Sequence, residues 1–172
     1  MKTTTSNFNA IEALEGQIRL RLVLFIIGLV VSGLTAFPIE WELQQAHQWM
    51  AQNQWSNSFT RWIERAYQGV RETNTRYTFI SYGSDWLGFA HLVIAIAFIG
   101  PVRDPVRNRW IVEFGIISCL AVFPFAFVAG YIREIPVFWR LIDCMFGTVG
   151  GLMLWRCYVR IKSLEKIKLS RA

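Results

Sequence analysis

Residues 20–37, LRLVLFIIGLVVSGLTAF, contain one charged side chain and constrain the fold more than any other part of the sequence. Three more apolar stretches follow, at about 78–100, 110–131 and 138–159. About 20 mostly apolar residues in a helix span the hydrocarbon core, and a helix satisfies its own backbone hydrogen bonds there. The sequence therefore predicts an all-α polytopic membrane protein built as a four-transmembrane-helix bundle.

The composition agrees with this class of protein. Of the 172 residues, 53% are hydrophobic and 17% are charged, whereas soluble domains carry about 25% charged residues. The four spans and one long loop use nearly the whole chain, so we expect residues 1–172 to form a single membrane domain. The net charge of +6 comes from basic residues beside the spans, which favours a lipid bilayer as partner and argues against nucleic acid.

The distribution of lysine and arginine predicts the orientation. The segments before the first span, between the second and third, and after the fourth are richer in basic residues near span ends than the other loops. The positive-inside rule then places both termini in the cytoplasm of a cell (inner) membrane, with loop 38–77 outside. One alternative stays open, because Arg19, Arg21 and the apolar run also resemble a cleavable signal peptide, which would leave three spans.

Segments outside the spans show helical patterns. In segment 1–19, Asn9 and Glu12 have the spacing of a capping box, which predicts a short amphipathic helix on the cytoplasmic surface. In the outer loop 38–77, Trp55, Phe59 and Trp62 recur at helical spacing and predict one or two amphipathic helices.

The fourth helix is expected to continue beyond the membrane. Residues 160–172 alternate apolar and basic side chains, which predicts a basic cytoplasmic tail that contacts anionic lipid headgroups. Each nearby basic side chain contributes about 1 kcal/mol to such binding.

Small residues indicate how the spans pack. In lipid, helices associate where small side chains allow close approach. The candidate small faces are Gly28 and Ser32 in the first span, Gly115, Cys119, Ala126 and Gly130 in the third, and Gly147 and Gly151 in the fourth. These faces serve packing within the bundle or contacts with a homo-oligomer or partner subunit. Pro124 is expected to kink the third span unless neighbouring groups compensate.

Four polar residues within or beside the spans are candidates for a ligand or proton site. They are Asp85, His91, Arg140 and Asp143. An ionisable group deep in a membrane costs at least about 2.5–3.5 kcal/mol, so such groups face the bundle interior and carry function or form pairs. Asp143 is expected near the packing face of its helix, where Arg140 is close enough in sequence to pair with it. Asp85 and Asp143 are expected at similar depth in the outer leaflet, and the sequence leaves open whether they meet.

Other polar residues suggest structural roles or limit the chemistry. Arg109 and Glu113 have the spacing of a structural i, i+4 ion pair. The sequence contains no nucleotide-binding loop, no hydrolase nucleophile motif and no zinc-ligand spacing, so no metal site is predicted and the cofactor is unknown. The second histidine, His47, lies in the outer loop, which does not suit a haem held between two histidines.

Three functions remain open at this point. The first is binding or moving a lipid, small amphiphile, proton or small solute through the polar cluster. The second is a membrane-embedded acid–base enzyme acting on a lipophilic substrate, with Asp85, His91 or Asp143 as acid and base. The third is a structural subunit of a membrane complex.

Overall fold

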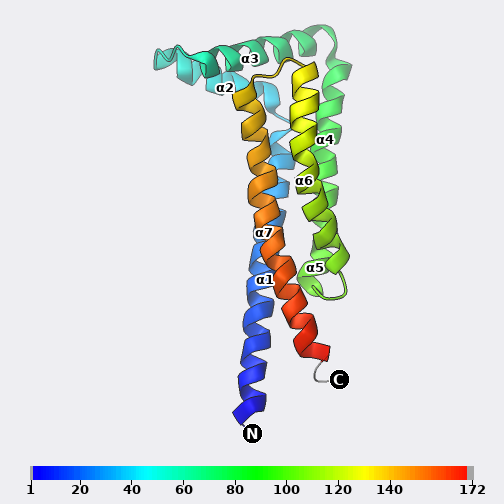
Figure 1. The fold of residues 1–172 in the computed structure, drawn as a ribbon. Coiled ribbons are helices and arrows are strands. Elements are labelled where there is room, and N and C mark those ends of the chain that lie inside the picture. The colour runs from blue at the N-terminus through cyan, green and yellow to red at the C-terminus, as the bar shows by residue number, and fades with distance from the viewer. Residues whose placement is uncertain (1, 170–172) are drawn as a thin grey trace. The chain divides into compact units, whose positions relative to one another are not determined.

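The computed structural model describes the backbone of residues 2–169 and the side chains of residues 11–169, and this part of the chain contains helices and no strand (Figure 1). The helices are α1 (Lys2–Thr35), α2 (Ile39–Gln52), α3 (Ser58–Arg76), α4 (Thr78–Ala97), α5 (Ile99–Arg103), α6 (Arg109–Ile132) and α7 (Val137–Leu169). Four of them, α1, α4 continued by α5, α6 and α7, are long and apolar enough to cross a membrane. The predicted all-α class with four candidate spans is therefore confirmed.

The chain groups into two compact units. Of the described residues, 2–27 and 95–169 form the first unit, and residues 28–94 form the second. Helices α1 and α4 each contribute one end to either unit. The predicted site residues are accordingly divided, with Asp85 and His91 in the second unit and Arg140 and Asp143 in the first.

The first unit is held together by close packing of α6 against α7, which run side by side (Figure 1). A Cβ atom on Gly147 of α7 would lie 2.7 Å from the carbonyl oxygen of Cys119 on α6. A Cβ atom on Gly115 of α6 would lie 2.6 Å from the side chain of Leu154. Such distances leave room for hydrogen only, so these glycines allow the backbones to approach as closely as they do.

The N-terminal part of α1 packs in the same unit. Ile18 and Leu22 are fully buried, as is Cys157 of α7, whose thiol points at the Ile18 carbonyl oxygen 4.0 Å away. Towards the chain ends, Lys168 forms an ion pair with Glu15, at 3.0 Å. At Glu15 and Ile18, α1 is therefore packed against α7 of its own chain.

The second unit depends on an equally close contact between the end of α1 and α4. A Cβ atom on Gly33 would lie 2.8 Å from the Gly88 carbonyl oxygen, and one on Gly88 would lie 2.7 Å from the Gly33 carbonyl oxygen. The contact is reciprocal, so neither position accepts a larger residue without moving a helix. The sequence indicated Gly28 and Ser32 for this role, but a Cβ atom on Gly28 would meet nothing within 4 Å.

The predicted helical outer loop consists of α2 and α3, which pack on each other, with His47 stacked on Tyr67 at 5.4 Å between ring centroids. Asn57 caps α3, because its side-chain oxygen accepts a hydrogen bond from the Thr60 N–H at 2.9 Å. Trp55 precedes this cap, so the predicted helical face that began at Trp55 is wrong. Its ring instead contacts Trp49 edge-on at 4.9 Å.

Two predicted helix boundaries are also wrong. Helix α1 runs through Asn9 without a break, so no helix start requires a cap there, and the segment 1–19 is continuous with the first span. Pro101 does not end the second span, because it lies in the first turn of α5, where a missing N–H removes no hydrogen bond. Helix α6 likewise continues through Pro124 to Ile132.

Most of the apolar surface of the four long helices is exposed. Only 17–22% of the residues in the most apolar window of each helix are buried. A water-soluble protein would bury such surface, since contiguous exposed apolar patches beyond a few hundred Å² are rare on soluble monomers. The exposure and the four candidate spans therefore suggest a multi-pass membrane protein.

The contact between Gly33 and Gly88 predicts a strong position dependence of valine substitution. Gly33→Val and Gly88→Val should each lower the free energy of unfolding by about 1–3 kcal/mol through overpacking. Gly28→Val on α1 and Gly83→Val on α4 are matched controls, since a Cβ atom at either position would meet nothing within 4 Å. Thermal unfolding in detergent measures the difference, and equal losses at contact and control positions would contradict the assignment.

Candidate functional site

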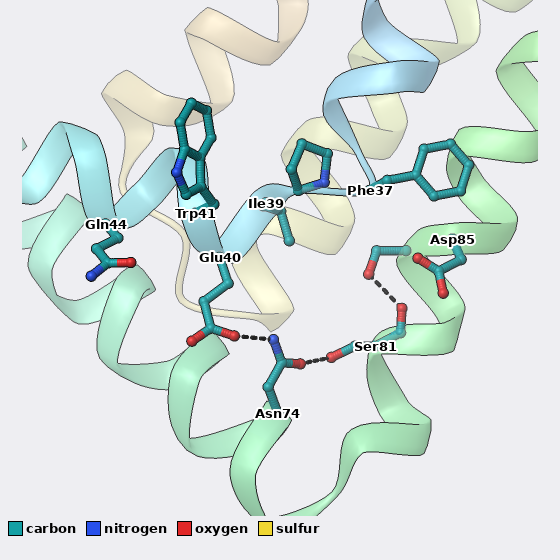
Figure 2. A pocket seen from close by; sticks show the side chains of 10 residues that line it. Phe37, Ile39, Glu40, Trp41, Gln44, Asn74, Ser81 and Asp85 are labelled. Carbon is teal, nitrogen blue, oxygen red and sulfur yellow. Dashed lines mark hydrogen bonds between the residues drawn. The ribbon is translucent and has the colours of Figure 1, made fainter.

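Asp85 lies at a pocket of about 340 Å³ in the second unit, formed by the α1–α2 connection, α2, α3 and α4. We call it the α2–α4 pocket. Its lining residues are Phe37, Pro38, Ile39, Glu40, Trp41, Gln44, Asn74, Ser81, Ser84 and Asp85. Figure 2 shows Asp85 on the side nearest Phe37, with Trp41 and Gln44 on the opposite side. The pocket thus combines aromatic and aliphatic surface with two carboxylates.

A chain of hydrogen bonds connects three helices along one wall of this pocket (Figure 2). The Asn74 amide of α3 donates to the Glu40 carboxylate of α2, and the Ser81 hydroxyl of α4 donates to the Asn74 carbonyl oxygen. The Ser84 hydroxyl in turn donates to the Ser81 backbone carbonyl oxygen at 2.6 Å. These four residues, Glu40, Asn74, Ser81 and Ser84, are the polar network.

Local sequence explains why these side chains converge. Pro38 is the N-cap residue of α2, which begins at Ile39, so Glu40 lies in the first turn of that helix. Asn74 lies in the last turn of α3, and one residue, Tyr77, separates that helix from α4. Ser81, Ser84 and Asp85 recur at steps of three or four residues and therefore lie on one side of α4. The short α1–α2 and α3–α4 connections thus bring the start of α2, the end of α3 and the start of α4 close together.

His91 lies on α4 in the same unit but does not line the pocket. Its Nδ1 atom is 2.8 Å from the Leu87 carbonyl oxygen one turn earlier. The side chain is half-buried, and its Cβ atom is 3.1 Å from the position that a Cβ atom on Gly33 would take. This geometry is that of a packed, hydrogen-bonded histidine.

Arg140 and Asp143 lie on α7 in the first unit. Arg140 packs its aliphatic stem against Gly130 of α6, and its Nε atom donates to the Ile135 carbonyl oxygen at 2.7 Å. Among the described residues, no ion pair joins Arg140 to Asp143. The guanidinium is held at the α6–α7 connection instead, so the predicted pairing does not occur.

Asp143 is exposed, which corrects its predicted position near the packing face. The buried stripe of α7 passes through its neighbour Cys144 and then Gly147. The residues around Asp143 on the exposed side, Ile142 and Met145, are themselves exposed apolar side chains. A difference of one position is about 100° around a helix, which was enough to take Asp143 off the packed stripe.

Arg109 and Glu113 form an ion pair of 3.1 Å, at the spacing noted in the sequence. Glu165 of α7 joins them, with its carboxylate 2.8 Å from Arg109. The arginine therefore connects α6 to the extended end of α7, and the role of this cluster is structural. The described residues contain no group of three or more histidine, cysteine, aspartate or glutamate side chains placed to hold a metal ion.

Sequence reasoning indicated Asp85 as a candidate site residue together with His91, Arg140 and Asp143, but it gave no indication of Glu40, Asn74 and Ser81, which line the pocket with Asp85. Glu40 resembled an ordinary acidic residue at a helix start, and Asn74 is more than 30 residues away from it in the chain. One pattern in the sequence could have indicated this cluster. Asn74 lies near the end of an amphipathic segment, and Ser81 and Ser84 follow at helical spacing at the start of the next apolar segment. Comparison with protein-family models, curated protein sequences and solved structures finds no match to this chain.

The polar network predicts that Asn74 stabilises the second unit. Asn74→Leu should lower the free energy of unfolding by about 1–3 kcal/mol, because it leaves Glu40 and Ser81 without their partner. Gln68→Leu on the same helix is the control, since that exposed side chain bonds only weakly to Glu64, at 3.4 Å. Chemical denaturation in detergent measures both variants, and equal stability of the two would contradict a stabilising network.

Proposed function

We propose that this protein is a multi-pass membrane protein that binds a small amphiphile in the α2–α4 pocket. The observation that carries the proposal is the lining of that pocket. Phe37, Ile39 and Trp41 offer apolar surface beside the carboxylates of Glu40 and Asp85. Ligand sites are typically concave and largely apolar, with a few placed polar groups, and the volume of about 340 Å³ is within the usual range.

The polar network supports this proposal because it fixes one wall of the pocket before a ligand arrives. Glu40 is held by Asn74, and Asn74 is held by Ser81. A preorganised site loses less conformational entropy when it binds. Asp85 would contact the ligand directly. It lines the pocket but is not part of the polar network, so its carboxylate can interact with the polar end of an amphiphile.

Photolabelling tests the proposal. The neutral amphiphile 3-azioctanol should label residues of the α2–α4 pocket when the purified protein is irradiated in zwitterionic nanodiscs. Diazirines insert into carboxylates and aromatic rings, so Glu40, Trp41 and Asp85 are the expected positions. Mass spectrometry of peptides locates the adducts, and an excess of 1-octanol should reduce those at the pocket by at least about half.

Filling the pocket provides the matched variant. Ser84→Phe should lower pocket labelling several-fold, whereas Trp49→Leu should leave it unchanged because Trp49 does not line the pocket. Labels spread along the exposed apolar faces of the long helices, with no enrichment at the pocket and no effect of Ser84→Phe, would overturn the proposal.

We further propose that the protein lies in the cell (inner) membrane with both termini in the cytoplasm, and that α2 and α3 lie outside. The greater number of basic residues beside the termini and the α5–α6 connection supports this orientation. Exposed basic residues at the end of α7, such as Lys166, would then face anionic lipid headgroups. A homo-oligomer or a partner subunit on the exposed helix faces is compatible with this arrangement.

Accessibility labelling tests the orientation. Gln54→Cys, in the α2–α3 connection, should react with an impermeant maleimide in intact cells, and Ser163→Cys, on α7, should react only after permeabilisation. Both native positions are exposed. The three native cysteines, Cys119, Cys144 and Cys157, are buried, so the wild-type protein supplies the background. The reverse labelling pattern would invert the topology.

A further inference from the structure

The α2–α4 pocket is lined by the carboxylates of Glu40 and Asp85 and by no basic side chain. From this we infer that the polar end of its ligand is a cation, namely an ammonium group on a short apolar chain or ring. This inference rests on the proposed amphiphile binding and specifies its ligand class.

The first argument concerns the direction of the hydrogen bonds. The Ser84 hydroxyl donates to Ser81, the Ser81 hydroxyl donates to Asn74, and the Asn74 amide donates to Glu40. The hydroxyl hydrogens of Ser84 and Ser81 and one N–H of the Asn74 amide are therefore directed along the wall of the pocket. The acceptors remain, since a carboxylate has about four lone-pair sites and Glu40 receives one hydrogen bond from this network. An ammonium group, with donors and no acceptor, complements this surface.

The second argument concerns charge. Glu40 and Asp85 line the pocket, whereas none of the residues that line it is a lysine, arginine or histidine. The start of α2 also lies here, and the aligned peptides of a helix place about half a positive charge at its N-terminus. Glu40, in that first turn, and Asp85 together exceed this partial charge, so the balance at the pocket stays negative. An anionic headgroup would be repelled.

The third argument concerns the apolar wall. Trp41 and Phe37 line the pocket together with the two carboxylates. Aromatic faces attract cations, by roughly 0.5–2 kcal/mol according to how far the site excludes water. The same rings accept an aliphatic chain. One ligand class, an amine with an apolar body, therefore satisfies the acceptors, the charge and the rings together.

A series of headgroups on one tail tests the inference. Octylammonium, 1-octanol and octane-1-sulfonate compete with 3-azioctanol for labelling at the pocket in zwitterionic nanodiscs at pH 7. Octylammonium should displace the label at a concentration at least about tenfold lower than either of the other two compounds. A charge-assisted hydrogen bond contributes enough binding free energy for about a tenfold or larger difference in affinity. Partition into the lipid differs among the three, so each is compared between wild type and variants in identical nanodiscs.

Neutral variants isolate the carboxylates. Asp85→Asn and Glu40→Gln should each remove most of the preference for octylammonium, while 1-octanol competes as before. Glu42→Gln is the matched control, because it makes the same change in charge on the same turn of α2 without lining the pocket. Circular dichroism and thermal unfolding check that every variant folds.

The outcomes separate the two proposals. Equal competition by the three compounds, or a preference for octylammonium that survives both Asp85→Asn and Glu40→Gln, would overturn the cation inference and leave amphiphile binding intact. An absence of pocket labelling in folded wild-type protein would overturn amphiphile binding, and the cation inference with it. A tenfold preference lost in the two pocket variants and kept in Glu42→Gln supports both.

Discussion

The close approach of α1 and α4 at Gly33 and Gly88 is the contact on which the second unit, and with it the pocket, depends. A Cβ atom on Gly88 would also lie 3.0 Å from the ring of Phe37, which lines the pocket. Asp85 lies three residues before Gly88, so the same turn of α4 bears the backbone contact and the pocket carboxylate. In a membrane there is no hydrophobic drive to bring helices together, and close packing of this kind takes its place.

The sequence predicted the broad fold because its main determinant is local. Twenty apolar residues in a row suffice to predict a span, and the spacing of Phe59 and Trp62 suffices to predict a helix in the loop. Boundaries were harder, as at Asn9 and Pro101, because a capping pattern does not show whether a helix already runs through it. The partner of each glycine was harder still, since Gly28 and Gly33 look alike in sequence and only tertiary packing distinguishes them.

In the candidate site, too, features that are local in the sequence could be predicted, whereas contacts between distant residues could not. Asp85 was predicted because a carboxylate in an apolar helix is conspicuous on any reading of the sequence. Asn74 and Glu40 were not, because their significance comes from a contact between residues distant in the chain. Asp143 was as conspicuous as Asp85, yet it is exposed and faces away from the packed stripe of α7. A conspicuous residue type therefore marks where to look, while the neighbours supplied by folding decide what the residue does.

The charged side chains are arranged differently in the two units. In the first unit Arg109 forms ion pairs with both Glu113 and Glu165, and the pair with Glu165 connects α6 to α7. In the pocket of the second unit two carboxylates share a lining that contains no basic side chain. An unpaired carboxylate that is removed from water is costly, so a ligand that shields Asp85 has to supply a compensating partner. In the proposed binding, a cation would supply that partner, and the electrostatic gain would be greatest where the surrounding medium is least polar. The proposed preference for an amine would therefore be larger in a pocket on the candidate span that contains Asp85 than for the same residues on an open surface.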